Sequence, residues 1–168
     1  MAPPGPTQRL AFREMTHADL DDMASLLGDP DVMRYYPRPK SRDEALAWID
    51  WNLGLYREHG FGLWILSLRA SGEFVGDCGL TLQTVEGITD VEVGYHVRTD
   101  LQRRGYATEA ASACRDHARD VVGCGRLIAM IDPANVPSQR VAESVGLRYE
   151  QDALTGSSGV QRIYAMAL

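Results

Sequence analysis

The chain has 168 residues, the size of one domain, and its hydrophobic fraction of 45% and charged fraction of 24% are ordinary for a globular protein. The net charge of -6 argues against a general nucleic-acid binder, because such proteins carry a basic surface that neutralises phosphates. No apolar run approaches the roughly 20 residues that cross a bilayer, so we expect a cytoplasmic protein without a membrane or nucleic-acid partner.

The spacing of cysteines and histidines predicts neither a disulfide framework nor a metal site. The three cysteines lack C-x-x-C spacing and are expected to be reduced thiols of the core. The four histidines are scattered without the spacing of metal ligands, so we expect no metal. These residues are Cys78, Cys114, Cys124, His17, His59, His96 and His117.

The first third of the chain predicts a strand and two helices. Residues 1–6 are proline-rich without the apolar core of a signal peptide, so we expect a flexible tail there and a single domain over residues 7–168. A short strand is expected within residues 7–13, followed by a helix capped by Thr16. A second helix is expected from Ser41, which opens a Ser-x-x-Glu capping box before an apolar stripe.

The sequence leaves the roles of three aromatic residues in this region open. Tyr35 and Tyr36 stand between the predicted helices, where they either fill the core or line a pocket with their polar tips. Trp51 falls off the apolar stripe of the second helix. It is a surface residue, a contact to a partner subunit, or a wall of a binding site.

The middle of the chain predicts three strands and a helix. Residues 61–68 and 74–83 are apolar, β-favouring stretches joined by a turn, as in an antiparallel hairpin. Apolar residues alternate with Glu92, Gly94 and His96 over residues 91–97, which is the pattern of a strand. From residue 107 to 122 small apolar residues recur at intervals of three and four, which predicts a helix that lies close to a sheet.

The last quarter predicts a buried strand, a helix and a hairpin. The continuous apolar run at residues 127–131 is typical of a central strand covered on both faces. A helix is expected from about Pro137 to a C-terminal turn at Gly146. Residues 147–154 and 160–168 are expected to form a final hairpin.

The junction between the strand at 91–97 and the helix from 107 is suited to an anion. It contains Arg103, Arg104 and Gly105, and the first amides of the following helix have no internal acceptor and lie at the positive end of its dipole. The simpler reading is a solvated turn, since isolated glycine-containing loops are weak signals.

Two motifs at this point resemble a known family. Gln102-x-x-Gly105-x-Ala107 is similar to the pyrophosphate loop of the GNAT superfamily of N-acetyltransferases, and Thr108-Glu109-Ala110 resembles its ribosomal-protein N-terminal acetyltransferase branch. Downstream, Asn135-x-x-Ser138 and the Gly146-Leu147 ending resemble the helix that follows the loop in that family.

The resemblance covers nearly the whole chain and implies an α+β GNAT fold. That fold has three layers, a mixed sheet of about seven strands with four helices, and strands that splay apart between the fourth and the fifth. The pantetheine arm of acetyl-CoA, the implied co-substrate, enters that opening. The implied cofactor-binding residues are Tyr95, His96, Val97, Arg98, Gln102, Arg103, Arg104, Gly105, Tyr106, Ala107, Thr108, Asn135 and Ser138.

Acetyl transfer to nitrogen requires a base, because free amines arrive mostly protonated. Glu92 is the best candidate, since it lies on the sheet face opposite the apolar residues and several GNAT members have a catalytic glutamate near the cofactor strand. The alternative is a glutamate that is exposed or only pairs with a cation. His96 is the competing base and shares the face of Glu92.

The motifs leave several candidates for the group that protonates the departing CoA thiolate. Much of the family uses a tyrosine seven residues after the motif asparagine, but this chain has Ala142 there. The resemblance then assigns the acid to Ser138, with Tyr149 or Tyr164 as further alternatives. Ser138 is equally explained as a helix N-terminal residue or a CoA contact, and Asn135 as an N-cap.

These patterns predict an acetyl-CoA-dependent N-acetyltransferase in which a bound amine attacks the thioester directly. The acceptor is a protein N-terminus or a small amine, with Tyr35, Tyr36 and Trp51 as candidate substrate contacts. The alternative is a non-catalytic CoA-binding sensor or interaction domain. Similar proteins are commonly dimers, so a homodimer is one expectation for the assembly. A nicotinamide enzyme is a poor third alternative, because no G-x-G-x-x-G opens a first βαβ unit.

Overall fold

A mixed seven-stranded sheet in the order β1-β2-β3-β4-β5-β7-β6 forms the centre of the computed structural model, which describes residues 1–155 and 159–168. Neighbouring strands are antiparallel except β4 and β5, which are parallel, so the predicted mixed sheet is confirmed. The tip of the predicted last hairpin, residues 156–158, lies outside the described residues. The strands are β1 (Leu10–Arg13), β2 (Leu63–Leu68), β3 (Phe74–Val85), β4 (Ile88–Val97), β5 (Arg126–Ile131), β6 (Arg148–Thr155) and β7 (Gly159–Ala167).

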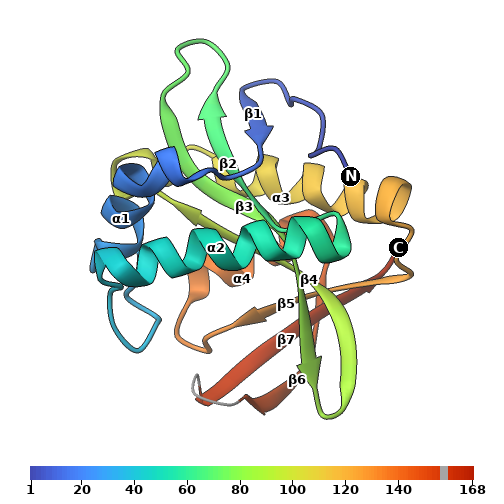
Figure 1. Ribbon diagram of the computed structural model, residues 1–168. Coiled ribbons are helices and arrows are strands. Elements are labelled where there is room, and N and C mark those ends of the chain that lie inside the picture. Colours follow the sequence, from blue (N-terminus) through green and yellow to red (C-terminus); the bar gives the residue numbers. More distant parts are fainter. Residues whose placement is uncertain (156–158) are drawn as a thin grey trace.

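Four α-helices cover the two faces of this sheet, as predicted. Helices α1 (Leu20–Gly28) and α2 (Arg42–His59) pack together on one face, and α3 (Tyr106–His117) and α4 (Val136–Val145) on the other (Figure 1). The helix predicted to reach residue 122 changes at Ala118 into a single π-helical segment, Ala118–Val122. No helix in the described ranges has the length and apolarity needed to cross a membrane.

Capping residues set the helix ends where the sequence predicts them. Ser41 Oγ accepts a hydrogen bond from the Glu44 amide at 3.2 Å, and the Glu44 carboxylate accepts one from the Ser41 amide at 2.7 Å. Asn135 Oδ1 accepts from the Ser138 amide at 3.2 Å, so Asn135 is the N-cap of α4. Gly60 ends α2 with φ +77°, a left-handed conformation that favours glycine. These bonds satisfy donors that the helix itself leaves free.

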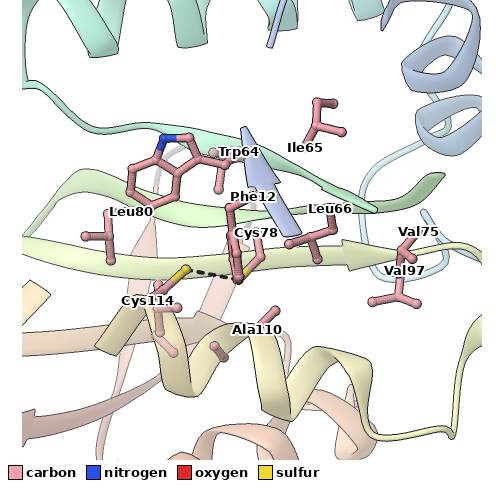
Figure 2. Packing of buried hydrophobic residues seen from close by; sticks show 14 of the residues in the cluster. Phe12, Trp64, Ile65, Leu66, Val75, Cys78, Leu80, Val97, Ala110 and Cys114 are labelled. Atoms are coloured by element: carbon pink, nitrogen blue, oxygen red, sulfur yellow. Dashed lines mark hydrogen bonds between the residues drawn. The ribbon is translucent and has the colours of Figure 1, made fainter. Parts of the chain in front are cut away.

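Small side chains on α3 let it lie close to the sheet. Ala110 and Cys114 are fully buried and face Trp64, Leu66 and Cys78 of the central strands (Figure 2). The Sγ atoms of Cys78 and Cys114 are 3.5 Å apart, and both thiols are free. Cys124 is also free and half-buried. The prediction of reduced core cysteines is thus confirmed for Cys78 and Cys114.

Strands β4 and β5 separate after two residue pairs. Val91 pairs with Leu127 and Glu92 with Ile128, but no pairing follows although β4 continues to Val97 and β5 to Ile131. Over the same length β5 remains paired with β7 on its other side. The predicted splay between the fourth and fifth strands is therefore present, and it leaves one backbone edge of residues 93–97 without a strand partner.

Candidate active site

The alternation of side chains along β4 places its two predicted catalytic residues on one face of the sheet and the predicted cofactor contact Tyr95 on the other. Glu92 lies opposite Thr81 of β3, and His96 lies opposite Asp77. Both therefore face α2 and the loop between α1 and α2. Tyr95 points to the other face, towards α4.

Glu92 is held at the point where the two strands separate. Thr81 Oγ1 donates to Glu92 Oε2 at 2.8 Å, and the amide of Met130 on β5 donates to Glu92 Oε1 at 3.4 Å. Burial raises the pKa of Glu92, and these hydrogen bonds and the nearby His96 offset the rise only in part. A carboxylate with a raised pKa in such a position is suited to accept a proton near neutral pH.

His96 is the centre of a buried hydrogen-bond network. Its Nδ1 lies 2.7 Å from Asp77 Oδ1 and its Nε2 lies 2.8 Å from the Tyr36 hydroxyl. Asp77 is completely buried and also accepts from the His96 amide at 3.1 Å and from Nε1 of Trp48 at 3.3 Å. Four segments thus meet here: α2, β3, β4 and the α1–α2 loop.

An open groove on α2 lies beside this network. It has a volume of about 310 Å³ and is lined by Lys40, Glu44, Ala47, Trp48 and Trp51. The rings of Trp48 and Trp51 are 5.1 Å apart, and Trp48 packs edge-on to the His96 ring at 5.9 Å. Trp51 is 40% exposed, so it is available to a ligand in the groove.

The other face of the opening brings Tyr95 and Ser138 together. The Tyr95 hydroxyl lies 2.8 Å from Ser138 Oγ and donates to the Ser138 carbonyl at 3.1 Å. Burial raises the pKa of Tyr95, so it remains a neutral phenol. The predicted acid, Ser138, is therefore paired with a tyrosine of β4.

The turn after β4 has the backbone shape expected of an anion site. Arg103 and Gly105 adopt left-handed φ values of +61° and +81°, and α3 begins directly afterwards at Tyr106. Gln102 Nε2 donates to the Val97 carbonyl at 3.0 Å, which ties the turn to the end of β4. In the described part of the chain no carboxylate pairs with Arg103 or Arg104.

Arg98 differs from its two neighbours in charge pairing. Its guanidinium pairs with Glu73 at 3.0 Å and with Asp100 at 2.7 Å and donates to the Phe74 carbonyl. The local basic cluster predicted from Arg98, Arg103 and Arg104 is thus reduced to the last two. Arg98 holds the β3 start to the turn instead.

Sequence analysis missed the N-terminal contact to the same turn. Arg9, just before β1, pairs with Glu109 of α3 at 2.6 Å and donates to the Arg104 carbonyl at 2.9 Å. Its guanidinium also lies 4.5 Å from the centre of the Tyr106 ring. Residues 7–9 are therefore bound to the first turn of α3, and Glu109 is the residue that joins them.

Comparison with known proteins gives the family. Residues 9–148 match the family profile described as an acetyltransferase (GNAT) domain. The chain belongs to the GNAT family of N-acetyltransferases. Members of this family use acetyl-CoA and act on an amine. A Bacillus subtilis relative, the uncharacterized protein YkkB, is 38% identical over 146 residues, which are 86% of this chain and 85% of YkkB.

Solved GNAT structures share the fold at low sequence identity. The acetyltransferase from Agrobacterium tumefaciens superimposes with a TM-score of 0.86 at 24% identity, covering 99% of this chain and 95% of that chain. RimL, a ribosomal L7/L12 alpha-N-protein acetyltransferase, superimposes with a TM-score of 0.79 at 18% identity, covering 100% and 96%. At these identities the likeness establishes the architecture alone.

The structure gathers some predicted site residues and separates others. On the α2 face it gathers Glu92, His96 and Tyr36. Trp51 lies beside the network, about one helical turn after Trp48 and in ring contact with it. Tyr35, next to Tyr36 in the loop, has no hydrogen bond or ring contact with the His96 network in the described part of the chain. Three residues were missed, namely Asp77 and Trp48 of the His96 network and Thr81, which donates to Glu92. Only the β3–β4 register reveals Asp77 and Thr81, because each lies opposite a β4 residue that sequence analysis singled out.

Proposed function

We propose that this GNAT enzyme transfers the acetyl group of acetyl-CoA to a primary amine by direct attack where β4 and β5 separate. One observation supports this most: beyond Glu92 the β4 backbone has an open edge, and at the same point β4 presents two titratable side chains, Glu92 and His96, to the α2 face. The open edge suits an extended pantetheine arm, and the side chains suit proton removal from an amine.

The residues around the opening fit acetyl-CoA, which when bound supplies a thioester carbonyl for attack. We assign the amides of Tyr95, His96 and Val97 to the pantetheine arm. We assign the turn from Gln102 to Thr108 to the pyrophosphate, because its left-handed residues and the free amides of α3 are arranged for an anion. Asn135 and Ser138 remain candidate contacts from α4, whereas Arg98 is committed to two carboxylates.

Protons leave the acceptor nitrogen twice, since an ammonium must lose two before it becomes an amide. We assign one of these protons to Glu92, whose raised pKa and position at the opening favour it as the base that acts during attack. On the opposite face, Ser138 with its hydrogen-bonded partner Tyr95 is the candidate donor to the CoA thiolate. A thiol with an ordinary pKa near 8.5 is already a fair leaving group, so this donor contributes less than the base.

The acceptor is expected on the α2 face, between Tyr36 and the Trp48–Trp51 groove. A peptide N-terminus is one class, as acted on by the RimL protein that shares this fold, and a small amine is the other. A homodimer also remains a prediction.

A thiol-release assay with acetyl-CoA tests the function against serine- and alanine-starting peptides, spermidine and kanamycin. We expect CoA release with at least one of these amines. Acetyl-CoA binding without turnover on any amine would instead indicate the alternative function, a non-catalytic CoA-binding sensor.

Arg104 gives a test of the proposed pyrophosphate turn. Replacing Arg104 with Gln should weaken acetyl-CoA binding by about 10- to 100-fold, because a charge-assisted hydrogen bond is worth about 1.5–3 kcal/mol. Calorimetric titration gives the Kd for acetyl-CoA. The difference in Kd between the wild type and the Arg104 variant should shrink as salt is added, because salt screens the charge of Arg104. Arg57→Gln, on the exposed end of α2, is the matched control and should bind normally. Equal Kd values for the two variants would remove Arg104 from the site.

A further inference from the structure

We propose that Asp77, His96 and Tyr36 form a proton relay in which the Tyr36 hydroxyl takes the first proton from the acceptor ammonium while giving its own proton to His96. This inference rests on the proposed acetyl transfer and adds a second route for protons beside Glu92. Tyr36 is then a catalytic residue, and Asp77 is a positioning residue that acts through His96.

The hydrogen-bond order of the three groups sets the direction of transfer. Asp77 accepts from the His96 backbone amide and from Trp48, so its carboxylate is fixed from two sides while it meets Nδ1 of His96 at 2.7 Å. With its proton on Nδ1, the imidazole presents a lone pair at Nε2, where the Tyr36 hydroxyl lies at 2.8 Å. The same arrangement of carboxylate, imidazole and hydroxyl moves protons in other enzymes of unrelated fold.

Burial explains why the proton must pass through Tyr36. His96 is 7% exposed and both of its ring nitrogens are occupied, so an amine has no direct path to it. Tyr36 is 44% exposed as a residue, although its hydroxyl points inward. Its position therefore joins the surface of the acceptor side to the buried imidazole.

The surroundings of Tyr36 keep its hydroxyl protonated. Burial raises the pKa of Tyr36, and the negative charges of Glu92 and Asp77 and the nearby Tyr95 raise it further. A free phenolate is therefore disfavoured, so the hydroxyl has to release its proton to His96 as it receives one. Glu92 lies on the same face of β4 as His96, so Glu92 and the Tyr36–His96 pair both face the α2 side of the sheet.

Each proton in this route has a donor and an acceptor. The ammonium gives one proton to the Tyr36 oxygen, the Tyr36 proton moves to His96 Nε2, and the resulting imidazolium is paired with the Asp77 carboxylate. The neutral amine attacks the acetyl carbon, the C–S bond breaks, and the second nitrogen proton goes to Glu92. The Ser138–Tyr95 pair gives one proton to the CoA thiolate and regains one from solvent, so CoA leaves as the thiol. Glu92 releases its proton to solvent and His96 does so through Tyr36, so each turnover releases one proton in total.

Two amines of different basicity test the relay with acetyl-CoA at neutral pH. Methylamine arrives as an ammonium, whereas 2,2,2-trifluoroethylamine arrives neutral because its fluorines withdraw electrons, and both are too small to depend on the acceptor walls. Tyr36→Phe should slow transfer to methylamine by about 10²-fold and leave trifluoroethylamine nearly unaffected. His96→Gln and Asp77→Asn should act alike, whereas Glu92→Gln should slow both amines.

The chain offers a matched control for the Asp77–His96 pair. Asp50 and His17 make the same contact at 2.7 Å on the exposed surface, so Asp50→Asn should leave both rates unchanged. Calorimetry with acetyl-CoA shows whether each variant is folded. If Asp77→Asn does not fold, the rates of Tyr36→Phe with the two amines alone test the relay. Equal slowing of both amines, or no slowing, overturns the relay. If the wild-type protein releases no CoA above the protein-free rate with these two amines or with any acceptor of the thiol-release assay, the proposed acetyl transfer fails, and the relay with it.

Discussion

Glu92→Gln is expected to reduce acetyl transfer by about 10²–10⁴-fold while acetyl-CoA still binds with unchanged Kd. Glutamine has the same shape and its amide oxygen still accepts from Thr81 or Met130, so the opening between β4 and β5 should persist. What is lost is the ability to take a proton from the attacking nitrogen. Single-turnover rates with any amine that supports CoA release, together with calorimetry, measure the two quantities separately.

The pH profile provides the second part of this test. Burial raises the pKa of Glu92, and a base works in its ionised form, so the wild-type rate should fall with decreasing pH at a point above the usual glutamate range. That loss should be absent in the Gln variant. Glu86→Gln, in the turn of the same β3–β4 hairpin, is the control and should match the wild type. Full activity in the Glu92 variant would remove this residue as base.

Local signals in the sequence were sufficient for the elements of the fold. The capping box at Ser41 and the N-cap at Asn135 have the partners that their spacing predicts. The alternation over residues 91–97 correctly placed Glu92 and His96 on one face, because a strand has a side-chain period of two. The motif around Gly105 also has the left-handed backbone that an anion-binding turn requires.

The surroundings of the site depend on tertiary contacts that no local pattern specifies. Asp77 stands in an apolar stretch of β3, and only the strand register sets it against His96. Tyr36 reaches His96 across 60 residues of chain, and Arg98 is paired by Glu73, which is 25 residues away. Sequence analysis therefore named the candidate catalytic residues but not those that orient or neutralise them.

The close approach of β3 and β4 beside the His96 network depends on a glycine. Gly76 has φ +152°, and a Cβ atom at this position would lie 2.0 Å from the carbonyl oxygen of His96. Because that oxygen belongs to the backbone of a paired strand, it cannot move aside without breaking the register between Gly76 and Val97. The glycine thus allows the strand spacing that sets Asp77 against His96.

Gly76→Ala should lower the free energy of unfolding by about 3 kcal/mol or more, from backbone strain and steric overlap together. For a chain of this length that corresponds to a fall in Tm of about 6–12 °C, measurable by calorimetry. Gly125→Ala is the matched control, since no atom lies within 4 Å of its added methyl group, and should change stability by less than about 0.5 kcal/mol. Any Gly76 variant that still folds should also lose transfer to methylamine more than to trifluoroethylamine, because the shifted His96 backbone displaces the relay. Equal melting of the two glycine variants would contradict the steric argument.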